Sequence, residues 1–121
     1  MFEEYDIVAG PGVSKDFFYE IIRAVGFLKD KTGLEINKQI IIHNESGEPG
    51  FYDSEDDTIY ISENGTIKRM KEKNCSQIFK AAICEILILF YLSKYKDHNE
   101  EKASKFAMDT IKQLNEELRY Y

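Results

Sequence analysis

Residues 76–92 read SQIFKAAICEILILFYL and decide the fold of this 121-residue chain. Beyond the first two positions almost every residue is apolar, so a helix built from this stretch has no polar stripe wide enough to face solvent. The apolar run is too short to cross a bilayer, and Glu85 interrupts it. We therefore expect a helix buried at the centre of the fold, with Asn74 or Ser76 as its N-cap.

The segments before this helix predict a helix and a strand. Ser14 can cap a helix whose apolar residues recur every three or four positions, until Gly33 ends it in a left-handed conformation. Residues 38–43 contain three consecutive isoleucines, and β-branched side chains favour an extended backbone. We expect a strand there that is buried on both faces.

A β-hairpin is expected next. Residues 51–53 and 58–62 bracket an acidic loop, and alternation should point Ile59 and Ile61 to one face and Tyr60 to the other. The Asn64-Gly65 pair predicts a turn that closes this unit. The basic cluster at residues 68–73 then predicts either a solvated connector or a contact surface for an acidic partner.

The last segment predicts an amphipathic helix. Its apolar stripe, with Phe106 beside it, consists of Ala103, Ala107, Ile111, Leu114 and Leu118. The expected order is thus helix, strand, β-hairpin, buried helix and amphipathic helix. That order predicts one α+β domain with a small sheet, preceded by residues 1–13 as an N-terminal extension.

Composition restricts the possible functions. The chain has 22 acidic and 16 basic residues, a formal charge of −6, which disfavours nonspecific binding to nucleic acid. Cys75 and Cys84 would lie about 13 Å apart along one helix, too far for a disulfide. With no apolar leader, no membrane span and no disulfide framework, we expect a cytoplasmic protein.

Glu85 does not fit an ordinary core helix. Its own helical face is made by Ile78, Ala81, Ala82, Ile88, Leu89 and Leu92, and none of these side chains can pair with a carboxylate. A desolvated carboxylate must find a donor from another element, reach water in a cleft, or hold a proton. Glu85 is therefore either a hydrogen-bonded packing residue or a general acid/base, since metal-assisted hydrolysis uses a buried glutamate.

Two local patterns carry a family resemblance. Residues 83–88 read ICEILI, and residues 100–107 read EEKASKFA. Over about residues 14–114 the chain resembles the zincin-fold metallopeptidases, most closely the ImmA/IrrE type. In that family a helix with H-E-x-x-H is followed by a helix that opens with a glutamate and continues to Phe-Ala.

The resemblance implies a role for each matching position. Glu85 falls on the general base, Cys84 on the first histidine, Ile88 on the second, and Glu100 on the third ligand, with Glu101 as the alternative for that last place. The strand at residues 58–62 resembles the edge strand that lines the substrate cleft. Tyr52 and Tyr60 would then flank the relict site.

The departures from the family argue against a metal. A catalytic zinc needs three protein ligands, and an isoleucine at position 88 cannot supply one. A thiolate at Cys84 with a distant carboxylate is too sparse for a tight site. His43 and His98 are interpreted as surface or hydrogen-bonded residues. We expect no metal and no other cofactor.

The leading functional hypothesis is a pseudoenzyme. The resemblance implies a zincin-like, metallopeptidase-like domain of phage or mobile-element origin that has lost catalysis and regulates by protein binding. A peptide would add as a strand along residues 58–62. One alternative is a metal-dependent hydrolase with a non-standard site that uses Glu85, and another is an acidic inhibitor that mimics nucleic acid.

Overall fold

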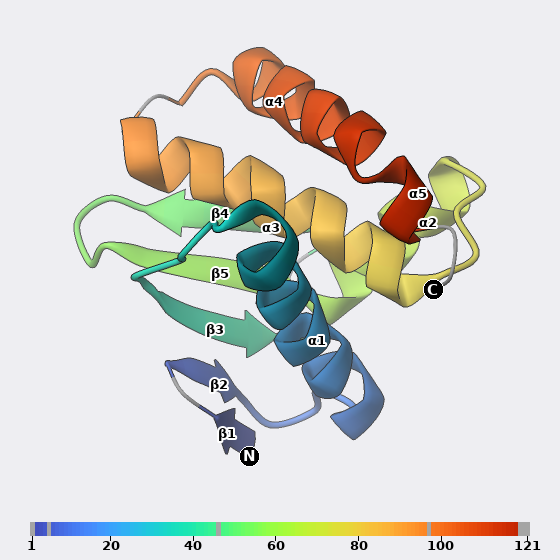
Figure 1. Ribbon diagram of the computed structural model, residues 1–121. Helices are drawn as coiled ribbons and strands as arrows, with labels where there is room; N and C mark the ends of the chain where they lie inside the picture. Colours follow the sequence, from blue (N-terminus) through green and yellow to red (C-terminus); the bar gives the residue numbers. More distant parts are fainter. Residues whose placement is uncertain (1, 5, 46, 97, 119–121) are drawn as a thin grey trace.

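The computed structural model describes residues 2–4, 6–45, 47–96 and 98–118. It contains a five-stranded mixed sheet with helices on one face (Figure 1). The strands are β1 (Phe2–Glu4), β2 (Ile7–Ala9), β3 (Gln39–His43), β4 (Gly50–Asp53) and β5 (Thr58–Ser62). The helices are α1 (Lys15–Thr32), α2 (Glu63–Glu72), α3 (Ile78–Tyr95), α4 (Glu100–Gln113) and α5 (Asn115–Leu118). The expected α+β class is confirmed.

The strand order is β1-β2-β3-β5-β4. The three central strands are parallel to one another, and β1 and β4 pair antiparallel with their neighbours at the two edges. The expectation that residues 58–62 form an edge strand is wrong, because β5 pairs with β3 on one side and β4 on the other. The edge strand of the hairpin is β4.

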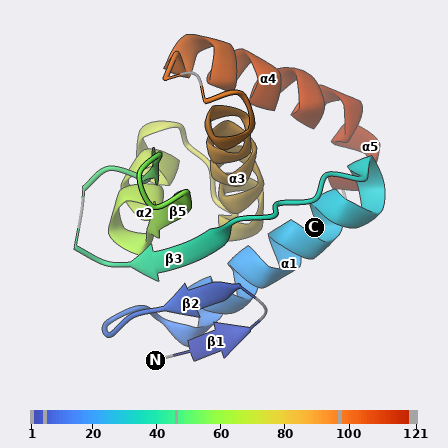
Figure 2. The same cartoon turned by 90° about the vertical axis from the view of Figure 1, so that its left-hand side faces the viewer.

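The helices α1 and α3 cover one face of the sheet, as two views at right angles show (Figures 1 and 2). The strand side chains that alternate toward these helices are buried: Ile7, Ala9, Ile40, Ile42, Tyr52, Ile59 and Ile61. Ile41 and Tyr60 point to the other face and are only partly buried. The isoleucine strand is therefore buried on one face and not on both, because both covering helices lie on the same side.

The N-terminal segment belongs to the sheet. Residues 1–13 were expected to form an extension, but residues 2–4 and 7–9 form β1 and β2, and β2 pairs in parallel with β3. Ile7 and Ala9 are fully apolar and buried against the helices. A three-residue strand is too short to be stable alone, and the pairing of β2 with β3 together with the burial of Ile7 and Ala9 stabilises β2 in the sheet.

The helix α1 has the two caps that its sequence predicts. The Ser14 hydroxyl accepts a hydrogen bond from the backbone N–H of Phe17 at 3.1 Å, and Gly33 ends the helix with φ of 74°. Ser14 also donates to the carboxylate of Glu63, from its N–H at 2.9 Å and from its hydroxyl at 2.6 Å. The start of α1 is thereby tied to the first turn of α2.

The central helix is α3, which packs against α1 on one side and α4 on the other (Figure 1). Its burial confirms the expectation of a buried helix at residues 76–92. The expected N-cap, Asn74 or Ser76, is wrong. The N-cap is Gln77, which makes no side-chain capping bond. Asn74 instead ends α2, in a left-handed conformation with φ of 53°, and the next N–H, that of Cys75, donates to the carbonyl of Met70 at 2.8 Å.

The pair Asn64-Gly65 lies in the first turn of α2 and not in a loop. Ser62 caps this helix, accepting from the N–H of Gly65 at 3.1 Å. A Cβ atom at Gly65 would stand 2.1 Å from the carbonyl oxygen of Glu48. The glycine therefore permits close packing of α2 against residues 48–50. The expected turn is wrong because the glycine serves this close approach inside a helix and not a change of chain direction.

The C-terminal segment forms two helices where one was expected. The helix α4 ends at Gln113, and α5 begins at Asn115. The expected apolar stripe is confirmed, because Ala103, Ala107, Leu114 and Leu118 are buried while Phe106 and Ile111 are partly buried. Among the described residues no helix has the combined length and apolarity that crossing a membrane requires.

Candidate functional site

Glu85 lines a cavity of about 190 Å³ between β4, α3 and the start of α4. The walls combine apolar side chains with several that can carry charge. The residues around it are Glu48, Pro49, Gly50, Phe51, Tyr52, Arg69, Glu85, Ile88, Leu89, Leu92, His98, Glu100 and Ser104. We refer to this cavity as the β4–α3 cleft.

Glu85 accepts a hydrogen bond from a side chain on another helix. Nη1 of Arg69, on α2, lies 3.0 Å from Oε1 of Glu85. The Glu85 side chain is 5% exposed and that of Arg69 is 37% exposed, so the pair joins a desolvated carboxylate to a guanidinium that still reaches water. No described residue donates a hydrogen bond to Oε2 of Glu85.

Burial raises the pKa of Glu85 above its ordinary value, and Arg69 opposes that shift. A smaller contribution from the Glu100 carboxylate raises the pKa further. Desolvation thus outweighs the cation, as expected when the partner is partly solvated and so stabilises the charge less than bulk water does.

Arg69 reaches Glu85 because residues 63–72 are helical. Ser62 caps α2, Gly65 allows the helix to approach residues 48–50, and Met70 is buried. Residues 68–73 therefore contribute a site residue, and the interpretation of this cluster as a connector is wrong because residues 68–72 belong to α2. The interpretation as a contact surface for an acidic partner stays a prediction. The signals for the helix were Ser62 as a cap and the three-residue spacing of Ile67 and Met70.

In the edge strand β4, the backbone groups of Gly50 and Tyr52 point away from the rest of the sheet. The N–H of Ser62 donates to the carbonyl of Pro49 at 2.8 Å, and hydrogen-bonded pairs alternate along an antiparallel ladder. Phe51 is therefore bonded to Tyr60 in β5, whereas Gly50 and Tyr52 direct their N–H and C=O groups away from β5. Both of these residues line the cleft.

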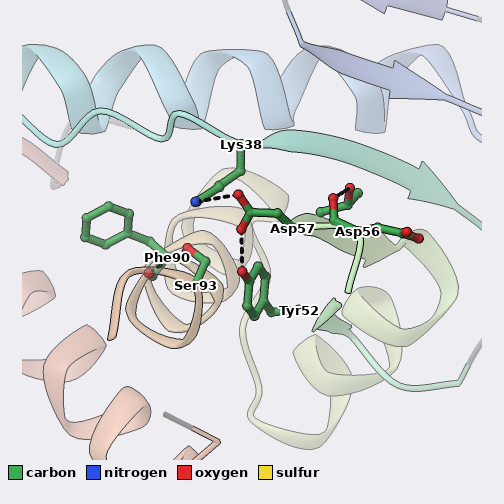
Figure 3. Close-up of polar contacts among 7 residues, drawn as sticks. Lys38, Tyr52, Asp56, Asp57, Phe90 and Ser93 are labelled. Carbon is green, nitrogen blue, oxygen red and sulfur yellow. Dashed lines mark hydrogen bonds and ion pairs between the residues drawn. The ribbon is translucent and has the colours of Figure 1, made fainter. Parts of the chain in front are cut away.

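A polar network fixes Tyr52 at one end of the cleft. Figure 3 shows the Tyr52 hydroxyl and the Lys38 ammonium meeting at the carboxylate of Asp57, and Lys38 Nζ lies 2.8 Å from Oδ2. The hydrogen bond to Asp57 raises the pKa of Tyr52, and the bond from Lys38 lowers the pKa of Asp57. Since Asp57 follows β4 and Lys38 precedes β3, the network holds the hairpin tip against the sheet.

The structure brings four of the expected site residues together and separates the others. Glu85, Ile88, Glu100 and Tyr52 all line the β4–α3 cleft. Cys84 does not line it, although it is the neighbour of Glu85 on α3. The alternative Glu101 is also outside the lining, so position 100 is the one that faces the cavity.

Tyr60 lies away from the cleft. It points to the uncovered face of the sheet, where its ring stacks on Phe51 at 4.7 Å between centroids with an interplanar angle of 8°. The expectation that Tyr60 flanks the relict site is wrong, because successive side chains of a strand point to opposite faces and Ile59 and Ile61 take the inner one.

The thiol and the histidines give no metal centre in the described ranges. There no three His, Cys, Asp or Glu side chains come close enough to hold an ion. Burial raises the pKa of Cys84, and the nearby Glu85 raises it further, so the thiol form is favoured. His98 lines the cleft and is exposed, whereas His43 is in β3, where its Nδ1 accepts from the N–H of Glu45 at 3.2 Å.

A larger cavity of about 420 Å³ lies elsewhere, between α1 and the starts of β2 and β3. Half of its lining residues are aliphatic, and Lys29 and Glu35, which also line it, form an ion pair with 3.7 Å between Nζ and Oε1. None of the ionisable side chains among its described lining residues is buried. The smaller cleft is therefore the candidate site, since it holds a carboxylate that is nearly removed from water.

No family model matches the chain, and no curated protein or solved structure matches it either. The zincin-like interpretation therefore stays a hypothesis, which rests on the two sequence patterns and on the position of Glu85, Ile88 and Glu100 around the cleft.

Proposed function

We propose that this protein is a non-catalytic, zincin-like domain that regulates by binding an extended segment of another protein in the β4–α3 cleft. The observation that carries the proposal is that an antiparallel edge strand borders a cavity whose most buried carboxylate is that of Glu85. The peptide would lie along β4, and not along residues 58–62, because β5 is internal to the sheet.

Strand addition is favoured by the backbone of β4. Gly50 and Tyr52 offer N–H and C=O groups at the edge, and a peptide that pairs with them gains main-chain hydrogen bonds without a metal. The cavity volume of about 190 Å³ is below the roughly 300–1,000 Å³ of small-molecule sites, so it suits a single side chain of a bound peptide.

Two features support binding without hydrolysis. Ile88 stands where the family has its second histidine, and an aliphatic side chain supplies no metal ligand. Arg69 engages Oε1 of Glu85, and a general base in a metallopeptidase must instead be directed at a metal-bound water. Both features favour a cleft that recognises a peptide and leaves it intact.

The test is to select dodecapeptides from a random display library against the immobilised full chain and to measure their affinity by fluorescence anisotropy. Each peptide is also made with alternate amides N-methylated, in the two possible registers. We expect one register to abolish binding and the other to leave it unchanged, because only one set of amides faces β4. Failure to recover a binding peptide, or equal binding of both registers, would overturn the proposal.

The alternative function, a metal-dependent hydrolase, predicts a different result with the same peptides. The protein, purified without chelator and equilibrated with zinc, is analysed for bound metal and for peptide cleavage by mass spectrometry. We expect intact peptides. Cleavage together with one zinc per chain that is lost in Cys84→Ala would contradict the non-catalytic proposal.

A further inference from the structure

Phe51, on the edge strand β4, is an apolar residue that is 48% exposed. Its neighbour Tyr52 is buried on the helix-covered face, so Phe51 points to the uncovered face of the sheet. On that face the strand register places four side chains in one row, those of Phe51, Tyr60, Ile41 and Val8. The row crosses β4, β5, β3 and β2, and Phe51 ends it at the edge of the sheet.

The ring of Phe51 has one covered face and one open face. It stacks on the ring of Tyr60 with 4.7 Å between centroids and an interplanar angle of 8°. That separation equals the spacing of neighbouring strands, so the two rings are stacked along the direction in which strands pair. The second face of the Phe51 ring is therefore turned to the unpaired side of β4, and no other ring among the described residues lies against it.

A strand added to β4 brings one of its side chains to this open ring face. Gly50 and Tyr52 supply the backbone groups for pairing, and the peptide residue opposite Phe51 then shares the uncovered face with it, whichever way the peptide runs. The added strand would lie about 4.8 Å from β4, a separation that suits a third stacked ring. An aliphatic side chain there gains burial alone, and a charged one would face an apolar row.

We infer that the β4 edge selects peptides with an aromatic residue opposite Phe51, whose ring continues the stack of Tyr60 and Phe51. This inference rests on the proposed function and specifies the chemistry of the peptide that binds there. Phe51 is then the residue that determines specificity on the uncovered face. The aromatic pair also fixes the register of the peptide along β4, because main-chain pairing alone does not distinguish one register from another.

The experiment is a positional scan of the peptides recovered by display. Each position is replaced in turn by Phe, Leu and Glu, and affinities are measured for the wild-type chain and for Phe51→Leu, Phe51→Tyr and Tyr19→Leu. Leucine at position 51 keeps an apolar side chain without the ring, whereas tyrosine keeps the ring. Tyr19 is 44% exposed on α1 and does not line the cleft, so its variant is the matched control for loss of an exposed ring.

We expect one peptide position at which Phe binds about fivefold tighter than Leu to the wild-type chain. That ratio should fall to about one in Phe51→Leu and persist in Phe51→Tyr and Tyr19→Leu. In proton NMR spectra of the wild-type chain, the Phe peptide but not the Leu peptide should move the ring protons of Phe51 upfield, because a second ring then covers them.

Two results would overturn this inference alone. One is binding that depends on amide methylation but shows no position with an aromatic preference. The other is a preference for Phe that survives unchanged in Phe51→Leu, since the peptide ring would then lie against another part of the protein. Binding that is insensitive to amide methylation would overturn the proposed function as well.

Discussion

Nη1 of Arg69 lies 3.0 Å from Oε1 of Glu85, and this contact joins residues of two helices, α2 and α3, that are 16 positions apart in sequence. The carboxylate is buried on α3, while the guanidinium projects from α2 and remains 37% exposed. Removing one partner therefore has a different cost in stability from removing the other. Arg69 without Glu85 can be hydrated in place, whereas Glu85 without Arg69 stays buried.

The first prediction concerns this asymmetry. Arg69→Gln should lower the free energy of unfolding at pH 7 by about 2 kcal/mol, less than the 3–5 kcal/mol of a fully buried pair because Arg69 is partly solvated. Glu85→Gln should change it by less than about 1 kcal/mol, since the amide oxygen can still accept from Arg69. Urea denaturation measures both, with the exposed Lys68→Gln on the same helix as control.

The same pair determines a pH dependence. The folded pKa of Glu85 lies above its unfolded value of about 4.3, so the stability that its protonated form contributes is complete below that pH and is lost as pH rises through the folded pKa. Removing Arg69 raises the folded pKa further. The deficit of Arg69→Gln should therefore grow between about pH 4 and about pH 7, and a deficit independent of pH would contradict this assignment.

The second prediction concerns the junction of α1 and α2. Ser14 donates twice to Glu63, so Ser14→Ala should destabilise the fold by about 1–2 kcal/mol, through the lost cap and the lost hydroxyl bond. A double-mutant cycle with Glu63→Gln should give a coupling energy of at least about 0.5 kcal/mol. Strict additivity of the two single variants would show that the hydroxyl bond contributes nothing to stability.

The third prediction concerns the hairpin tip. Because the hydrogen bond to Asp57 is the largest cause of the raised pKa of Tyr52, Asp57→Asn should return that pKa toward about 10. Asparagine also tolerates the left-handed conformation of this position, where φ is 51°. Carbon-13 shifts of labelled tyrosine rings measure the titration, and the neighbouring exposed Asp56→Asn should leave it unchanged.

Tyr52→Phe tests the same network from the other side. The folded pKa of Asp57 is depressed, so its contribution to stability is present above about pH 4 and is lost as pH falls through the folded pKa. Removing the tyrosine hydroxyl raises the folded pKa of Asp57. The acid-induced loss of stability that Asp57 causes should then be smaller, and complete at a higher pH, than in the wild-type chain, and an unchanged acid limb would refute the network's role.

The fourth prediction concerns Cys84. Burial raises its pKa, and the thiolate is the form that reacts, so alkylation by iodoacetamide at pH 8 should be at least about tenfold slower than in the urea-unfolded chain. The Cys75→Ser variant isolates this thiol. Reaction as fast as in the unfolded chain would indicate an accessible thiolate and would favour Cys84 as a metal ligand.

The sequence predicted the elements whose local signals agree with their burial. Ser14 and Gly33 delimit α1, and the apolar run around Glu85 forms the central helix. The strands β1 and β2 were missed because three residues are too few to show a period. The helix α2 was missed because Gly65 was interpreted as a turn residue, although it serves a close approach to Glu48.

The part of the site that depends on the geometry of one helix was predicted from the sequence, and the part that depends on how helices pack was not. Glu85 was identified because its own face on α3 offers no partner, and this needs only the helical period. Arg69 was not identified, because its pairing depends on how α2 packs on α3. The assignment of residues 58–62 as the edge failed for a similar reason, since strand order is set by the long-range pairing of β3 with β5.

The most direct test of the central claim is to map a bound peptide on the protein by backbone amide chemical shifts in nitrogen-15 NMR spectra. With a peptide recovered by display, we predict that the largest changes occur at Gly50 and Tyr52 on β4 and at Glu85 and Ile88 on α3. Changes confined to Ile41 and Tyr60, on the uncovered face of the sheet, would contradict the assignment of the β4–α3 cleft as the binding site.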